Sequence, residues 1–208
     1  MLCLVAVLSA LSALSCKAPV PKGAQVPVYF PLQKGAKWVY KSSAGKETRV
    51  VTEVKSDERG YTVAVANEGA GKWSAAEAVI VTDNGLFQAA YADEPLDPPI
   101  CIFKTPAKVG EKWNASASFS LFVLKTRFEV LEPEKVKVPA GLFQAVPVVR
   151  VFSLEWPPGN KAPLPPSAAP KTVTEWYAPN VGLVKSVRKE KAGDCVTELE
   201  SFMPGKPD

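Results

Sequence analysis

Short runs of β-branched and aromatic residues alternate with turn residues along most of this chain. In residues 61–65 the large side chains take every second position, which is the period of a half-buried strand. Residues 76–82 and 86–91 flank Asn84 and Gly85, a pair that tolerates the positive φ angles of a tight hairpin turn. Close spacing of strands and turns predicts an antiparallel β-meander.

The predicted fold class is all-β or mainly β. We expect the meander to form a curved sheet, a half-barrel or an open barrel, over residues 29–203. The one helical candidate, residues 74–79, is short and leads into Ile80, so a strand is at least as well supported. Residues 204–208 form a tail without a fold signal.

A four-residue motif occurs twice. Pro31, Gly35, Lys37 and Trp38 recur at the same spacing as Pro106, Gly110, Lys112 and Trp113. In both copies Pro and Gly shape a turn, and Trp anchors the strand that follows. The repeat predicts two similar halves, residues 29–100 and 101–203, or one turn used twice.

Three tryptophans share a setting beside turn residues at a strand boundary, namely Trp38, Trp113 and Trp176. Large aromatic side chains at such positions usually close the end of a β core. The functional alternative is that they are ligand-cavity aromatics at the mouth of a concave apolar site. Residues 157–170 are too rich in proline for a strand and predict a mobile loop with polyproline character.

Residues 1–15 form an apolar run of Leu, Val, Ala and Ser that ends at Cys16. The run is too short to span a bilayer, which needs about 20 apolar residues, and it fits an export signal. Residues 16–28 are rich in proline and small residues and predict an extended tether. An ordinary cleaved signal and a buried strand are the other interpretations of the run.

Residues 12–16, Ser-Ala-Leu-Ser-Cys, resemble the lipobox of bacterial lipoproteins. The resemblance implies that Cys16 is diacylated with palmitate-like chains and becomes the mature N-terminus. The protein would then be exported and anchored by lipid to a membrane of the cell envelope.

The composition excludes several kinds of chemistry. The chain contains no histidine, so Ser-His-Asp and Cys-His systems and His-ligated zinc are ruled out. Its net charge of +4 is spread thinly, unlike a nucleic-acid surface. No cofactor, metal site or nucleic-acid partner is predicted.

Two of the four cysteines, Cys3 and Cys16, belong to the N-terminal run. Cys101 and Cys195 would face an oxidising compartment, where two thiols commonly form a disulfide. Two independent buried thiols are the alternative.

An enzyme without histidine would rest on paired carboxylates. The candidates are Glu129, Glu132 and Glu134, or Glu198 and Glu200. Ordinary two-residue alternation explains every such pair, so a hydrolase is disfavoured and no catalytic residue is assigned.

Three stretches resemble a recurrent bacterial envelope lipoprotein module of unknown function. They are Pro31, Gly35, Trp38 and Tyr40; residues 138–145, VPAGLFQA; and residues 176–185, WYAPNVGLVK. More distantly, such modules are similar to periplasmic lipoprotein carriers, whose half-barrels surround an apolar cavity. The resemblance implies a non-enzymatic protein that binds an apolar ligand or lipid on a concave β surface. The alternative is an interaction module that binds an envelope protein or cell-wall polymer through its loops.

Overall fold

The computed structural model describes residues 28–58, 60–69 and 72–206. The predicted signal, Cys3, Cys16 and nearly all of the tether lie outside these residues. The strands are β1 (Lys37–Ser42), β2 (Gly45–Asp57), β3 (Gly60–Gly69), β4 (Lys72–Thr82), β5 (Gly85–Tyr91), β6 (Glu94–Lys104), β7 (Lys112–Phe119), β8 (Phe122–Val130), β9 (Glu134–Val138), β10 (Gly141–Glu155), β11 (Lys171–Ala178), β12 (Gly182–Arg188) and β13 (Cys195–Met203).

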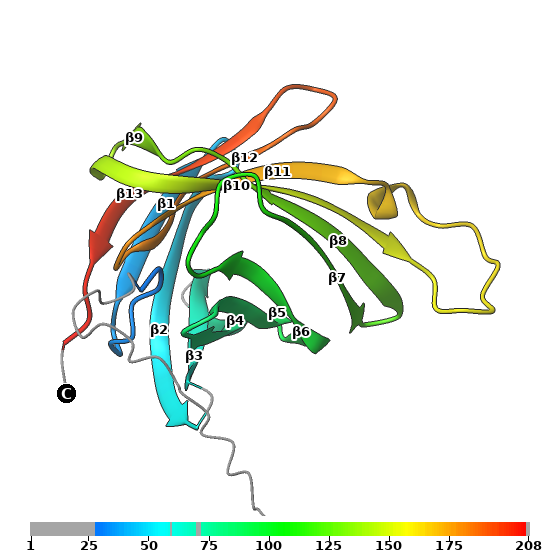
Figure 1. The fold of residues 1–208 in the computed structure, drawn as a ribbon, viewed down its shortest axis with the longest axis horizontal. Helices are drawn as coiled ribbons and strands as arrows, with labels where there is room; N and C mark the ends of the chain where they lie inside the picture. The colour runs from blue at the N-terminus through cyan, green and yellow to red at the C-terminus, as the bar shows by residue number, and fades with distance from the viewer. Residues whose placement is uncertain (1–27, 59, 70–71, 207–208) are drawn as a thin grey trace, which may run out of the picture.

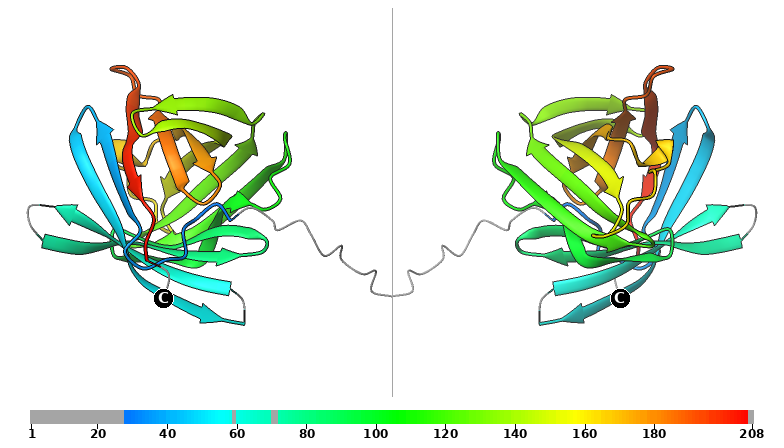
Figure 2. Two further views of the ribbon diagram at one scale, coloured as in Figure 1. Left: turned by 90° about the vertical axis from the view of Figure 1, so that its left-hand side faces the viewer. Right: turned by 90° about the vertical axis from the view of Figure 1, so that its right-hand side faces the viewer.

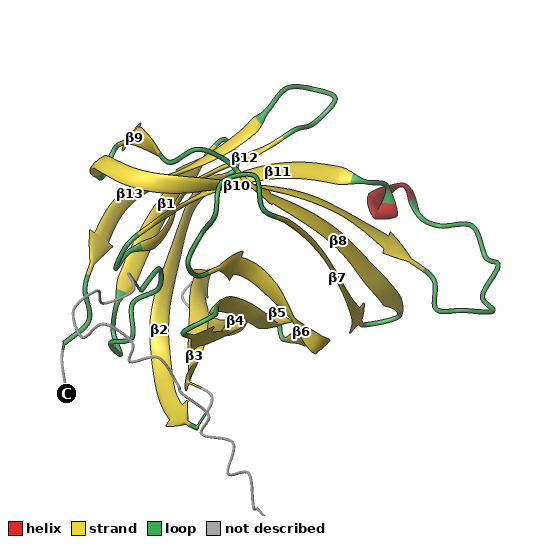
Figure 3. Ribbon diagram, viewed as in Figure 1, coloured by secondary structure: helices red, strands yellow, loops and turns green. Residues whose placement is uncertain are grey.

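Twelve of these strands close into an antiparallel barrel (Figures 1 and 3). Strands β1 to β8 form a meander, β8 pairs with β10, and β10 continues through β11 and β12 to β13. The last strand then pairs with the first, from Lys37 opposite Met203 to Ser42 opposite Thr197. Strand β9 pairs only with the first part of β10. The predicted all-β fold is confirmed.

The sheet closes instead of remaining a half-barrel. Closure joins β1 to β13 and so removes the two free edges that an open sheet would expose. Residues 74–79, the helical candidate, lie within β4. The helical structure in the described residues is one 3₁₀ turn, η1 (Pro166–Ala168). No helix in this part of the chain is long and apolar enough to cross a membrane.

The repeated motif forms the same turn in both copies. Gly35 has a φ of +82° and Gly110 a φ of +78°, a region of backbone conformation that favours glycine. The amide of Gly35 donates to the carbonyl of Val51 at 2.8 Å, and that of Gly110 donates to the carbonyl of Val130 at 2.9 Å. The copies precede β1 and β7, which stand on opposite sides of the barrel.

One end of the barrel is filled by side chains, and we call it the filled end. Successive turns of an antiparallel barrel alternate between its ends, so the starts of β1, β5 and β7 and the ends of β6 and β11 meet here (Figure 2). Fully buried side chains gather at this end, including Phe103, Phe128, Leu86, Leu199 and Val184.

Two segments close the filled end. The ring of Tyr29 lies 4.4 Å from that of Phe103, and the ring of Phe30 lies 5.6 Å from that of Trp38. The turn between β9 and β10 reaches β13, where the amide of Ala140 donates to the carbonyl of Leu199 at 3.0 Å. An extended segment and a hairpin therefore close this end of the barrel.

Candidate ligand cavity

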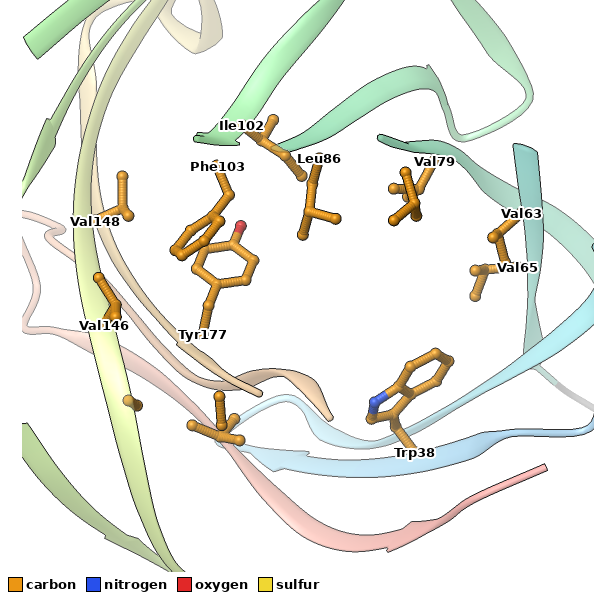
Figure 4. Packing of buried hydrophobic residues seen from close by; sticks show 14 of the residues in the cluster. Trp38, Val63, Val65, Val79, Leu86, Ile102, Phe103, Val146, Val148 and Tyr177 are labelled. Carbon is orange, nitrogen blue, oxygen red and sulfur yellow. The ribbon is translucent and has the colours of Figure 1, made fainter. Parts of the chain in front are cut away.

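The barrel interior above the filled end holds a cavity of about 570 Å³. This volume lies within the roughly 300–1,000 Å³ of typical small-molecule sites. Side chains from opposite walls point toward the same interior, as Figure 4 shows for Trp38, Val79, Leu86 and Tyr177. The barrel therefore encloses room for one small molecule.

Two buried aromatic side chains of β1 lie at the floor of the cavity and are hydrogen-bonded there. The indole Nε1 of Trp38 donates to the carbonyl of Val181 at 2.7 Å, and the hydroxyl of Tyr40 donates to the carbonyl of Leu183 at 2.8 Å. Both bonds cross from β1 to the β11–β12 hairpin, which closes the barrel on that side. Burial raises the pKa of Tyr40, so its hydroxyl stays protonated and remains a donor.

A cluster of paired polar groups lies on the wall formed by β2, β4 and β5. Arg49 Nε lies 2.9 Å from a carboxylate oxygen of Glu47, and Arg49 Nη1 lies 3.4 Å from one of Glu77. The amide of Gln88 donates to the other carboxylate oxygen of Glu77 at 2.9 Å. Burial raises the pKa of Glu77, and Arg49 opposes that shift. Burial alone would lower the pKa of Arg49, but Glu77, Tyr40 and Glu47 together hold it above its ordinary value.

Arg150 on β10 differs from Arg49 because its charge has no such partner. Its Nε is buried and has no hydrogen-bond partner among the described residues. Its guanidinium carbon lies 4.8 Å from the ring centroid of Phe152, two residues along the same face of the strand. Both side chains border the cavity, so an unpaired cation and an aromatic face are presented together to its interior.

The predicted proline-rich loop, residues 157–170, contributes to the cavity wall. Ser167 and Ala168 of its 3₁₀ turn η1, and Ala169 directly after the turn, border the cavity, and Ala168 is buried. Pro165 and Ala169 on either side of the turn keep the extended backbone of polyproline type. The ring of Trp156 stacks on Phe122 at 4.6 Å, which holds the start of the loop against β8.

Of the three predicted ligand-cavity aromatics, Trp38 borders the cavity, and Trp113 and Trp176 do not. Trp113 stacks on Phe128 at 4.9 Å with an interplanar angle of 12°, within the apolar core. Trp176 lies on the other face of β11 from buried Tyr177, and its Nε1 donates to Glu134 at 2.7 Å. The shared sequence setting therefore covers three different environments.

The carboxylates named as hydrolase candidates form no interior pair. Three of them make ion pairs with lysines that are at least partly exposed, which are Glu129 with Lys112, Glu198 with Lys185 and Glu200 with Lys46. The carboxylates that do border the cavity are Glu47, Glu77 and Glu175, which sequence reasoning missed. The sequence does hold a signal for Glu77, because this residue shares a strand face with the apolar residues Val79 and Val81. A charged residue on an otherwise apolar face is a candidate for an interior site. In the described residues no group of three or more His, Cys, Asp or Glu side chains could hold a metal ion.

The predicted bridge between Cys101 and Cys195 is absent, because the structure has both thiols free. Cys101 lies on β6 and Cys195 begins β13. Five strands separate β6 from β13 around the barrel in either direction, β1 to β5 on one side and β7, β8, β10, β11 and β12 on the other. A disulfide requires Cα atoms within about 7 Å, which strands on opposite walls do not provide.

The sequence matches no protein-family model and no curated protein. Two crystal structures share the fold. One is of a candidate exported protein with a YmcC-like fold from Bacteroides fragilis NCTC 9343. Its sequence is 18% identical to this chain, the TM-score is 0.56, and the match covers 85% of this chain and 99% of that chain. The other is of a candidate lipoprotein from Parabacteroides distasonis ATCC 8503, which is 16% identical with a TM-score of 0.55, and the match covers 86% of this chain and 100% of that chain. This chain is therefore similar in fold to proteins described as exported or as lipoproteins.

Proposed function

We propose that the protein is a lipid-anchored protein of the bacterial cell envelope that binds one small molecule inside its barrel, without catalysing a reaction. The observation that carries the proposal is the cavity of about 570 Å³, with a filled floor and a wall that mixes aromatic, aliphatic and charged side chains. Small-molecule sites typically combine an apolar lining with a few placed polar groups.

The lining favours an amphipathic ligand over a purely apolar one. Leu96, Phe119 and Leu124 offer apolar contact, whereas Arg150 and Glu175 offer charge in the same space. An alkane-like molecule would leave those charges without water or partners, at a cost in free energy. A molecule with one polar group and an apolar body avoids that cost.

Filling the cavity tests this proposal. Leu124 borders the cavity and is 6% exposed, whereas Leu121 in the β7–β8 turn is 71% exposed. We expect wild type and Leu121→Trp to bind one equivalent of a fluorescent fatty acid, 11-(dansylamino)undecanoic acid, and Leu124→Trp to bind it at least tenfold more weakly. Overpacking costs about 1–3 kcal/mol, so circular dichroism must first show that Leu124→Trp is folded. Equal binding by the two variants would contradict an interior site. Absence of a saturable response in wild type would favour an interaction module that works through its loops.

The anchor is tested separately. The lipobox-like residues 12–16, and the description of one structural neighbour as a lipoprotein, support acylation at Cys16. We expect wild type to sediment with membranes and Cys16→Ala to be soluble or to remain an unprocessed precursor. An intact mass that shows an unmodified N-terminus at another position would refute the anchor and leave the cavity proposal unaffected.

A further inference from the structure

The upper part of the cavity has two chemically different walls. Tyr91, Leu96, Phe119 and Leu124 line it from β5, β6, β7 and β8, which are consecutive strands of the barrel. The next strands, β10, β11 and β12, line it with the cations Arg150, Lys171 and Arg188. We call these the apolar wall and the cationic wall.

The strand register places the three cations of the cationic wall near one another. Val173 of β11 is paired with Arg150 on one side and with Arg188 on the other. Lys171 lies two residues from Val173 on the same face of β11. Neighbouring strands are about 4.8 Å apart, so the backbones of Arg150 and Arg188 lie about 10 Å apart, within reach of long side chains.

The charges that face the cavity are not all paired with one another. Its lining includes the cations Arg49, Arg150, Lys171 and Arg188 and the carboxylates Glu47, Glu77 and Glu175, four against three. Two of the carboxylates, Glu47 and Glu77, are taken by Arg49. Arg188 pairs at 2.7 Å with Glu190, outside the cavity.

Arg150 is the cation of this wall with a buried nitrogen, Nε, that has no partner among the described residues. Glu175 is the carboxylate nearest to it in the strand register, because it is paired with Val148, two residues before Arg150. Glu175 accepts a hydrogen bond from the hydroxyl of Tyr177 at 3.3 Å, and no ion pair joins it to Arg150. The positive charge of Arg150 also acts on Glu77 and Tyr177, which share this space. The guanidinium is therefore held beside carboxylates but bonded to none of them.

A planar guanidinium with free N–H groups binds carboxylates and phosphates with charge-assisted hydrogen bonds, often two at once. The guanidinium of Arg150 also lies over the ring of Phe152. The apolar wall stands on the adjoining strands, where an alkyl chain would be removed from water.

We propose that the cavity binds a single-chain anionic amphiphile, whose carboxylate or phosphate monoester bonds to Arg150 on the cationic wall and whose chain lies on the apolar wall. This assignment rests on the proposed function and names the ligand class of that same site. Lys171, nearer the mouth of the cavity, contributes attraction for the anion as it enters.

The test compares ligands that share a chain and differ in charge. Isothermal titration calorimetry of the wild-type protein with dodecanoate, dodecyl phosphate, dodecanol and dodecyltrimethylammonium separates the headgroups, and inorganic phosphate and acetate test the headgroup alone. We expect dodecanoate or dodecyl phosphate to bind at least tenfold more tightly than dodecanol and dodecyltrimethylammonium. The stronger of the two anions identifies the headgroup.

Two variants test the residue. Arg150→Gln removes the interior cation, and Arg127→Gln removes a cation from the outer face of the neighbouring strand β8, where it is paired with Val151. We expect Arg150→Gln to weaken binding of the preferred anion at least tenfold and to leave dodecanol binding unchanged, while Arg127→Gln changes neither. Arg150→Gln loses no described hydrogen bond but does lose the contact with the ring of Phe152, so circular dichroism must first show that both variants are folded.

Each outcome decides the proposal. Equal binding of dodecanol and both anions by wild type overturns the anion site but leaves an interior apolar site, and this comparison needs no variant to fold. Equal weakening by the two glutamine variants overturns the role of Arg150. If none of the chains binds, both this assignment and the interior-site proposal fail.

Discussion

Trp38→Ala is expected to be the most destabilising of the tryptophan substitutions. The side chain is 2% exposed and packs against Phe30 and Phe202, with ring centroids 5.6 Å and 5.9 Å away. Deleting a buried tryptophan costs about 3–5 kcal/mol. For a domain of this size, 1 kcal/mol shifts the melting temperature by about 2–4 °C, so the expected fall is about 6–20 °C.

Trp176→Ala is the matched comparison, because the sequence places both residues at a strand boundary beside turn residues. Trp176 would lose one hydrogen bond to Glu134 and the contact with Lys185, whose Nζ lies 5.9 Å from the ring centroid. Those two contacts amount to about 1–2 kcal/mol, and the ring of Trp176, which is only partly buried against the core, adds less than the fully buried ring of Trp38. Trp38→Phe keeps most of the buried ring but leaves the carbonyl of Val181 without its donor, which costs about 1–3 kcal/mol.

The assay is equilibrium unfolding in urea, followed by far-ultraviolet circular dichroism so that loss of a tryptophan does not alter the probe. The expected order of the loss in free energy of unfolding is Trp38→Ala first, then Trp38→Phe and Trp176→Ala. A Trp176→Ala variant that is destabilised as much as Trp38→Ala would refute the assignment of Trp38 to the floor and of Trp176 to the outer face.

Three further predictions concern other parts of the barrel. Peptide mapping after alkylation of unreduced, denatured protein should find Cys101 and Cys195 both modified, and a cystine peptide would contradict the fold. Burial raises the pKa of Cys101 to about 11, so its alkylation in the native protein at pH 8 should be about two orders of magnitude slower than that of a free cysteine. Burial raises the pKa of Glu77, so its stabilising contribution is fully present below the pKa of an unfolded glutamate and is lost as pH rises through the folded pKa. In urea unfolding, the free energy of unfolding of wild type relative to that of Glu77→Gln should therefore be higher at pH 4 than at pH 7. An unchanged difference would refute the shift. Gly85→Ala should lower the free energy of unfolding by about 1–3 kcal/mol more than Gly45→Ala, because a Cβ at Gly85 would meet a backbone oxygen of β6 at 2.0 Å. Gly45 has a similar φ angle, but a Cβ there would meet no other atom within 4 Å. Equal melting temperatures of the two variants would contradict this prediction.

Local patterns were enough to predict the class of the fold. Alternation in residues 61–65 placed Val63 and Val65 on one face, and both are buried in β3. The pair Asn84 and Gly85 predicted a hairpin, and β4 and β5 are joined there. These features depend on side-chain period and on φ angles, which neighbouring residues determine by themselves.

Closure of the barrel was decided by contacts between distant parts of the chain. The pairing of β1 with β13 joins residues that no local pattern connects, and it places Cys101 and Cys195 on opposite walls. The same contacts separate Trp38 at the cavity floor from Trp176 on the outside, although their sequence settings are alike.

The cavity chemistry depends on the same long-range pairing. Arg150 alternates with apolar residues and could face either side of a strand, because Val149 and Val151 are apolar too. Its inward direction follows from its pairing with Val173 and its place between β8 and β11. Sequence alternation thus determined which residues share a face of each strand, while tertiary pairing determined which face is enclosed and which charges meet there, because those depend on strands far apart in the chain.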